Sequence, residues 1–303
     1  MRPQVLFIVG PTACGKSKLA VELAKRLAGE IISADSMQVY KGMDIGTAKP
    51  TSRERKNIPH HLMDIFSPAH LFSVYEYQKR ALIKIRQIIK RGKIPIVVGG
   101  SGLYVRSLLQ GLSGQPGADF KLRKKLEEEA SQRGLDTLYQ RLQKKDPERA
   151  AQINPNDQKR ILRALEILEA SPQKPSEWHQ SRQSLSDLGF DSRVIGITKD
   201  RQQLYSDIEK RVDQMFRKGL VKEVKQLMKG KISQTAAQAV GYKELFEFFV
   251  GRLSLSQAKD LIKRNTRRFA KRQWVWFKKE PKIEWVEWPE GVDVKKMADI
   301  ILK

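Results

Sequence analysis

The first twenty residues of the chain carry a pattern that binds phosphate. The P-loop pattern G-x-x-x-x-G-K-[ST] is present as Gly10, Pro11, Thr12, Ala13, Cys14, Gly15, Lys16 and Ser17. Glycines let the backbone curl so that successive N–H groups point at phosphate oxygens, and the following helix adds the partial positive charge of its N-terminus. Lys16 supplies a full charge, and the Ser17 hydroxyl suits Mg²⁺. The pattern predicts a site for a phosphate chain but does not identify the molecule that carries it.

A carboxylate follows the second expected strand, residues 31–33. Ligands of open α/β sheets bind at the carboxyl ends of strands, so we expect Asp35 to lie beside the P-loop. Three roles for this residue remain open: a Mg²⁺ ligand, a general base, or an N-cap of the next segment. Gln38 has an amide that could pair with an adenine edge.

Small residues end the next expected strand, residues 94–98, in the order Gly99, Gly100, Ser101 and Gly102. Such a run suits close approach of a ligand to the backbone, although a turn with Ser101 as N-cap is the alternative. A hydrolytic P-loop ATPase usually has an acidic residue after this strand, to hold Mg²⁺ and orient water. Its absence here disfavours a motor or an ATPase.

Cations recur at helical spacing in residues 157–170 and 255–278. They are Lys159, Arg160 and Arg163 in the first segment, and the rows of Lys263, Arg267 and Lys271 and of Arg264, Arg268 and Arg272 in the second. Few acidic residues offset them, which favours contacts with a phosphate backbone over a merely solvated face. Arg211 and Arg217 follow the last expected core strand, and either could reach the phosphate pocket. The pair His60 and His61 lacks further ligands at zinc spacing, so we expect it to structure a loop.

The overall charge points to a polyanionic partner. The 303 residues contain 58 Lys and Arg against 34 Asp and Glu, a formal net charge of +24. Nucleic acid is the commonest partner that rewards such an excess, and an anionic membrane surface is the lesser alternative. No apolar run approaches the roughly 20 residues of a membrane span, and a strand begins almost at once, so we expect no signal peptide. The single cysteine, Cys14, fits a reducing compartment. We expect a cytoplasmic monomer.

Alternating strands and helices predict an α/β fold, with a P-loop NTPase-like parallel sheet as its core and a mostly helical insertion. The expected core comprises residues 1–112 and 193–303, and the expected insertion comprises residues 113–192. The expected strands are 5–9, 31–33, 94–98 and 193–198, with an extended piece at 283–288. The expected helices are 16–27, 75–91, 119–133, 135–144, 157–170, 200–217, 219–229, 241–250 and 255–278.

In this order, the motifs resemble those of the tRNA dimethylallyltransferase family, also called the IPP transferase family, over nearly the whole chain. The resemblance is carried by residues 10–17, 35–50, 60–64, 98–104, 160–166, 240–244 and 267–273. It implies transfer of a dimethylallyl group from dimethylallyl diphosphate to N6 of the adenosine 3′-adjacent to certain anticodons, with release of diphosphate. A P-loop kinase of a small molecule is the alternative, and it would consume ATP. A non-enzymatic RNA-binding module is a third possibility, which an intact Lys16, Ser17 and Asp35 disfavour.

The resemblance also implies a role for each site residue. The P-loop would hold the donor's diphosphate with Mg²⁺ on Ser17, and Lys16 and Arg211, rather than Arg217, would stabilise the departing diphosphate. Asp35 would take the N6 proton, and Ser101 would hydrogen-bond the amine or Asp35. The adenine would leave its stack to reach them, and the insertion would grip the anticodon arm. The implied tRNA contacts are Asp35, Ser36, Met37, Gln38, Ser101, Arg123, Lys159, Arg160, Ile161, Leu162, Arg163 and Gln273.

Overall fold

The computed structural model describes residues 2–112, 117, 119–177 and 183–303. The chain forms two compact units, a core of Met1–Leu109 and Leu185–Lys303 and an insertion of Gln110–Ser184. The expected boundary at residue 113 lies outside the described residues, and the one at 192 is eight residues late. The insertion ends at Ser184 because Leu185 and Phe190 already pack in the core of the first unit.

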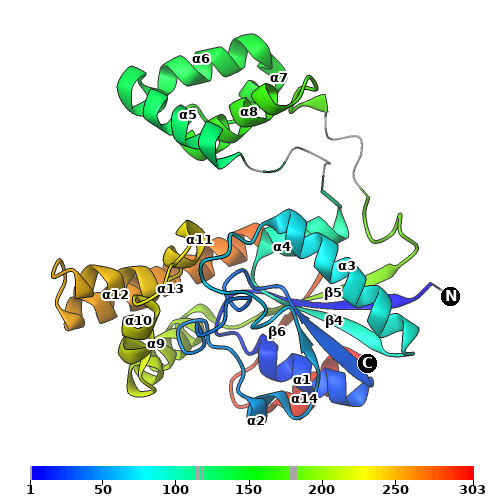
Figure 1. Ribbon diagram of the computed structural model, residues 1–303. Coiled ribbons are helices and arrows are strands. Elements are labelled where there is room, and N and C mark those ends of the chain that lie inside the picture. The colour runs from blue at the N-terminus through cyan, green and yellow to red at the C-terminus, as the bar shows by residue number, and fades with distance from the viewer. Residues whose placement is uncertain (1, 113–116, 118, 178–182) are drawn as a thin grey trace. The chain divides into compact units, whose positions relative to one another are not determined.

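Within the described residues the core is built on a parallel sheet of six strands, in the order β3-β2-β4-β1-β5-β6 (Figure 1). Their bounds are β1 Gln4–Val9, β2 Gly29–Ser33, β3 His60–His61, β4 Ile94–Gly99, β5 Asp191–Thr198 and β6 Ile283–Glu287. Val98 of β4 is level with Ile8 of β1 on one side and with Ser33 of β2 on the other. The apolar strands are those of a sheet covered on both faces. The α/β class expected from the sequence is confirmed.

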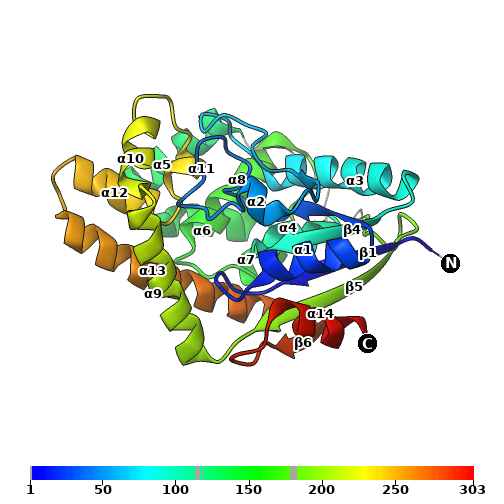
Figure 2. The same ribbon diagram turned by 90° about the horizontal axis from the view of Figure 1, so that it is seen from below.

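Helices cover both faces of this sheet. One face carries α1 (Lys16–Arg26) and α14 (Val294–Leu302), which lie side by side in Figure 2. The other carries α3 (Val74–Lys90) and α4 (Gly102–Leu109). Alternate residues of β1 serve the two layers, since Phe7 packs with α3 and Ile8 packs with α1.

The remaining core helices follow β5. They are α9 (Arg201–Arg217), α10 (Leu220–Leu227), α11 (Gln234–Ala237), α12 (Tyr242–Phe249) and α13 (Leu255–Lys278). The long helices match the ranges expected from the sequence to within a few residues. The short α2 (Ser52–Arg55), α11 and β3, and the terminal α14, were not expected.

The insertion is a helical unit with its own apolar core. It contains α5 (Phe120–Arg133), α6 (Leu135–Lys145), α7 (Pro147–Ala151) and α8 (Gln158–Ala170). Side chains such as Leu126, Leu138 and Leu165 fill its centre. The side chains of Asp119, Asp146 and Asp157 cap α5, α7 and α8 by accepting backbone N–H groups. The mostly helical insertion expected from the sequence is present.

The edge strand β3 is fixed by a buried carboxylate. The side chain of Glu30 on β2 is 3% exposed, and it accepts hydrogen bonds from His61 (2.7 Å) and Arg91 (2.7 Å) and pairs with Lys93 (3.0 Å). Burial alone would raise the pKa of Glu30, but these three partners outweigh it and lower the pKa to about 2. His61 therefore structures this edge of the sheet.

The Glu30→Gln variant tests this contribution to stability. A carboxyl group whose pKa is lowered by folding stabilises the protein above its unfolded pKa of 4.5, by up to about 3 kcal/mol here. We expect the variant to unfold at lower urea concentration at pH 7. The gap should close as the pH falls from about 4.5 to about 2, because wild-type Glu30 then becomes protonated as well. Urea unfolding at a series of pH values measures this, and a pH-independent gap would contradict it.

Candidate active site

The carboxyl ends of four neighbouring strands carry the candidate site. Along the order β2-β4-β1-β5, these ends lead to Asp35, to Ser101, to the P-loop and to α9. The Asp35 carboxylate is close enough to act on the pKa of Lys16 and Arg211. Its strand is nevertheless not next to the P-loop strand, because β4 lies between β2 and β1. The Ser101 turn consequently lies between the carboxylate and the phosphate cradle.

The P-loop has the backbone geometry of an anion site. Ala13 and Gly15 have φ angles of 67° and 97°, in the region where alternating backbone turns form anion-binding nests. Helix α1 begins directly after Gly15, and no side chain caps its N-terminus. The first N–H groups of the helix are therefore available to an anion.

Two cations meet at this loop, the buried Lys16 and the half-buried Arg211. The Lys16 ammonium donates to the carbonyl of Pro11, and Arg211 of α9 donates to the Thr12 hydroxyl at 3.3 Å. Burial lowers the pKa of Lys16, and the neighbouring Arg211 lowers it further. Burial also lowers the pKa of Arg211, whereas the Asp35 carboxylate acts to raise the pKa of both cations. Arg217 is exposed at the end of α9, so Arg211 is the arginine that reaches the P-loop.

The Asp35 carboxylate is engaged through one oxygen. Oδ1 accepts the backbone N–H of Met37 at 2.9 Å and of Gln38 at 3.4 Å, which is the capping role considered above. Oδ2 accepts no hydrogen bond from any residue that the structure describes. Asp35 thus combines a fixed orientation with an open acceptor at the half-buried mouth of the site.

The Ser101 turn is drawn tightly against the end of β2. The Ser101 N–H donates to the carbonyl of Ala34 at 3.2 Å, and its hydroxyl accepts the N–H of Ser36 at 3.1 Å. A Cβ on Gly99 would lie 2.1 Å from the same Ala34 carbonyl oxygen, so only glycine permits this approach. The hydroxyl of Ser101 is therefore tied to Ser36, next to Asp35.

Gln38 is held in place from both ends of its amide. Its Oε1 accepts from the Ser33 hydroxyl, and its Nε2 donates to the Thr47 carbonyl, each at 3.2 Å. One N–H and one lone pair of the amide remain for a ligand. Gln38 can still present the donor and acceptor pair that an adenine edge requires.

The loop that supplies Thr47 is anchored by a single carboxylate, that of Glu223 on α10. Glu223 accepts the backbone N–H groups of Asp44 (3.0 Å), Ile45 (2.8 Å) and Gly46 (3.1 Å), and the Tyr242 hydroxyl at 2.7 Å. Burial raises the pKa of Tyr242, and the Glu223 charge raises it further, so the phenol stays a donor. This role of Glu223 could not be recognised from sequence, because the residue is remote from every motif in the chain.

The insertion presents some of its expected tRNA contacts and buries others. Lys159 and Arg160 are exposed on α8. Arg123 and Arg163 both pair with the buried Glu166, at 2.7 Å and 3.1 Å. The side chains expected to contact tRNA from the apolar side of α8 are packed in the insertion core instead, and these are Ile161 and Leu162.

The two basic rows of α13 also differ from each other. Lys263 pairs with Asp213 of α9 at 2.9 Å, and Arg267 pairs with Glu209 of the same helix. The expectation that acidic partners are few is thus wrong for this row. Lys271, the third member of that row, instead lines a basic and partly apolar groove of about 400 Å³, together with Arg268, Arg272, Val275, Trp276 and Lys279. Gln273, expected to contact tRNA, is instead buried.

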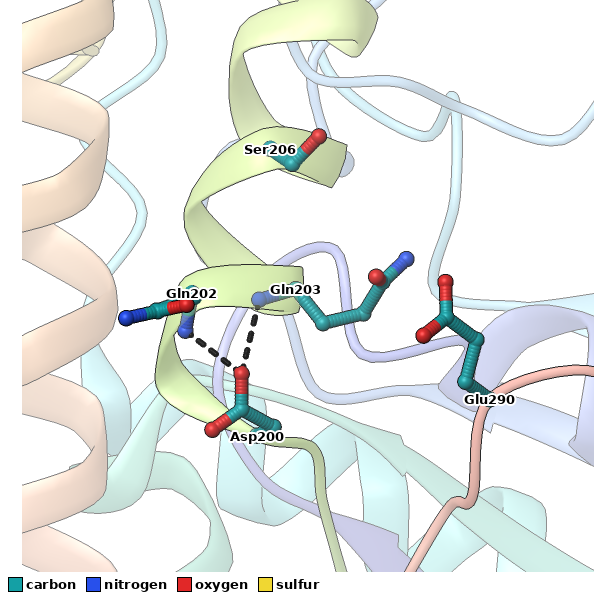
Figure 3. Close-up of a pocket in the computed structure, with 5 residues that line it drawn as sticks. All are labelled: Asp200, Gln202, Gln203, Ser206 and Glu290. Carbon is teal, nitrogen blue, oxygen red and sulfur yellow. Dashed lines mark hydrogen bonds between the residues drawn. The ribbon is translucent and has the colours of Figure 1, made fainter.

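Figure 3 shows a different pocket, of about 360 Å³, at the start of α9. Asp200 caps the helix through the N–H groups of Gln202 (2.8 Å) and Gln203 (3.0 Å), and Glu290 faces Gln203 from a separate segment. Carboxylates and amides line this pocket, so its chemistry does not suit a diphosphate. In the part of the chain that the structure describes, no helix is both long and apolar enough to span a membrane.

Comparisons with known proteins point to one family. The family model described as IPP transferase matches residues 38–280. The tRNA dimethylallyltransferase of Geobacter sulfurreducens is 45% identical over 294 residues, which are 96% of this chain and 94% of that protein. The enzyme of the same name from Carboxydothermus hydrogenoformans is 47% identical over 292 residues, covering 95% and 93%.

Solved structures give the same picture. The tRNA isopentenylpyrophosphate transferase of Bacillus halodurans superposes with a TM-score of 0.72 at 40% identity, covering 100% of this chain and 96% of that one. A eukaryotic dimethylallyltransferase acting on tRNA superposes with a TM-score of 0.80 at 32% identity, covering 94% and 74%.

The Glu223→Ala variant tests the anchoring of the 44–46 loop. It leaves three backbone N–H groups and a tyrosine hydroxyl without their acceptor, so we expect a loss of about 2 kcal/mol in the free energy of unfolding. The amides of residues 44–46 should exchange hydrogen at least tenfold faster. Glu247→Ala removes only an exposed ion pair with Arg252 and serves as the control. Unchanged exchange at residues 44–46 would show that another group anchors the loop.

Proposed function

Because the chain belongs to the IPP transferase family, we propose that it transfers a dimethylallyl group from dimethylallyl diphosphate to N6 of the adenosine 3′-adjacent to the anticodon of tRNA, releasing diphosphate. One arrangement in the structure carries the proposal. The buried Lys16 and the half-buried Arg211 meet at a P-loop, and an open carboxylate oxygen lies across the intervening Ser101 turn. This set provides for a leaving diphosphate and for a proton, which are the two products of such a transfer besides the modified base.

The donor's diphosphate binds in the P-loop. Its oxygens take the N–H groups at the start of α1, and Lys16 exchanges the Pro11 carbonyl for a phosphate oxygen. As the bond between the prenyl carbon and oxygen breaks, negative charge gathers on the departing group. Lys16 and Arg211 stabilise that charge more strongly in their buried setting than they would in water.

Ser17 fits a Mg²⁺ ion bound together with the diphosphate. The residue is exposed at the start of α1, and no described residue hydrogen-bonds its hydroxyl. Mg²⁺ is commonly held by one or two protein oxygens together with substrate phosphates and water. When bound, the ion would neutralise part of the diphosphate charge.

Asp35 acts as the base for the acceptor. The N6 lone pair of adenine is delocalised, and loss of a proton as the new C–N bond forms makes the nitrogen a better nucleophile. Oδ2 of Asp35 receives that proton, while Oδ1 keeps the carboxylate oriented through Met37. Gln38 contributes the remaining N–H and lone pair of its amide to the extruded adenine.

Each unit offers a basic surface to tRNA. The insertion presents Lys159 and Arg160, and α13 of the core presents the groove that includes Arg268 and Trp276. Cations beside a partly exposed aromatic ring suit phosphates and unstacked bases. The net charge of +24 agrees with a polyanionic substrate of this size.

Nucleoside mass spectrometry tests the proposed reaction. With unmodified tRNA, Mg²⁺ and dimethylallyl diphosphate, we expect one dimethylallyl mass gain on adenosine. Asp35→Asn should lower the rate by 10²-fold or more with donor affinity changed little, because it removes the base and not the cradle. Asp191→Asn, an exposed change at the amino end of β5, is the control. If the protein instead phosphorylated a small acceptor from ATP and left the mass of the tRNA unchanged, the kinase alternative would be favoured.

Salt dependence tests the insertion surface. A double Lys159→Ala and Arg160→Ala variant removes about two phosphate contacts, so the slope of log K against log salt should become shallower by one to two units. Lys79→Ala with Arg86→Ala, on exposed positions of α3, changes the net charge equally and should leave the slope as it is. Equal slopes for both double variants would place the tRNA contacts elsewhere. Filter binding of tRNA at several salt concentrations gives these slopes.

A further inference from the structure

A single buried amide bridges two loops of the candidate site. Gln273 lies in α13 and is 7% exposed. Its Oε1 accepts the backbone N–H of Thr12 at 2.8 Å, and its Nε2 donates to the carbonyl of Gly100 at 2.9 Å. Both ends of the amide are therefore satisfied by backbone groups more than 170 residues away in sequence.

The two backbone groups belong to opposite halves of the reaction. Thr12 is part of the P-loop, and its hydroxyl accepts from Arg211. Gly100 directly precedes Ser101, whose hydroxyl accepts the N–H of Ser36 beside Asp35. The Gln273 amide thus spans from the diphosphate cradle to the turn that borders the base.

The Gln273 amide is packed tightly against the turn that follows β4. A Cβ on Gly100 would lie 2.1 Å from Gln273 Nε2, so the turn approaches the amide as closely as glycine allows. Trp276, three residues further along α13, lies against the backbone of Gly102. Helix α13 therefore contacts the turn after β4 through two side chains, those of Gln273 and Trp276.

We propose that Gln273 is a positioning residue, which holds the P-loop at a fixed distance from the Ser101 turn before any substrate binds. The proposal rests on the proposed function only for what the two loops bind. In this role Gln273 does not touch tRNA, since neither end of its amide faces solvent. Because the P-loop is already held in place, the donor binds without the free-energy cost of ordering that loop.

Binding of inorganic diphosphate with Mg²⁺, measured by calorimetry, isolates this role from the prenyl chemistry. Gln273→Met keeps the length of the side chain and removes both hydrogen bonds, so we expect at least a tenfold weaker affinity for diphosphate. Affinity for tRNA should stay within twofold. Gln226→Glu, at an exposed position of α10, controls for the handling of the variants, and thermal unfolding confirms that each variant is folded.

Gln273→Glu provides a rescue that a merely structural role would not show. A carboxylate can accept from Thr12 but cannot donate to Gly100, whereas the protonated acid can do both. Relative to wild type at each pH, diphosphate affinity of this variant should recover as the pH falls towards 5, and that of Gln273→Met should not. This pair of responses keeps the test informative even if one variant is unstable.

The outcomes separate the two proposals. Unchanged diphosphate affinity in Gln273→Met, or a loss confined to tRNA, would overturn the positioning role even in an enzyme that transfers the prenyl group. A wild-type chain whose diphosphate affinity depends on Gln273 but that never modifies tRNA would overturn the proposed function alone. Failure of the wild-type chain to bind diphosphate at all would overturn both.

Discussion

The rest of the site depends on two positive charges shielded from water, those of the buried Lys16 and the half-buried Arg211. Burial disfavours a charge unless an opposite charge or hydrogen bonds compensate for it. Here a backbone carbonyl, a threonine hydroxyl and the more distant Asp35 carboxylate provide that compensation. A diphosphate would provide it far better, so this pair of cations favours the anion that the reaction releases.

The strand order of the sheet decides which groups lie near these two cations. Because β4 lies between β1 and β2, the strand that leads to Asp35 is one removed from the P-loop strand, with the Ser101 turn between the two. Residues far apart in the sequence are joined here by hydrogen bonds. Glu223 and Tyr242 hold the 44–46 loop, and that loop holds Gln38.

Much of this could be predicted from the sequence because it depends on local pattern. The P-loop, the apolar strands and the long amphipathic helices were all recognisable from spacing alone. The strand order could not be predicted, because a local pattern does not show which strands become neighbours in the sheet. Strand β3 was missed because it is only two residues long. Ile161 and Leu162 belong to a motif that resembles a binding segment. Their apolar side chains are nevertheless buried in the insertion core, where removal from water stabilises the fold. Gln273 carried a signal that was overlooked, because it falls on the same helical stripe as the buried Ala270 and Phe277.

The central claim is that the P-loop serves a prenyl diphosphate and not ATP. It is tested most directly by measuring, in one reaction with unmodified tRNA, Mg²⁺, dimethylallyl diphosphate and excess ATP, the diphosphate released and the dimethylallyladenosine formed. The structure predicts one diphosphate for each modified adenosine and an ATP concentration that does not change. Consumption of ATP with no gain in the mass of the tRNA would contradict it.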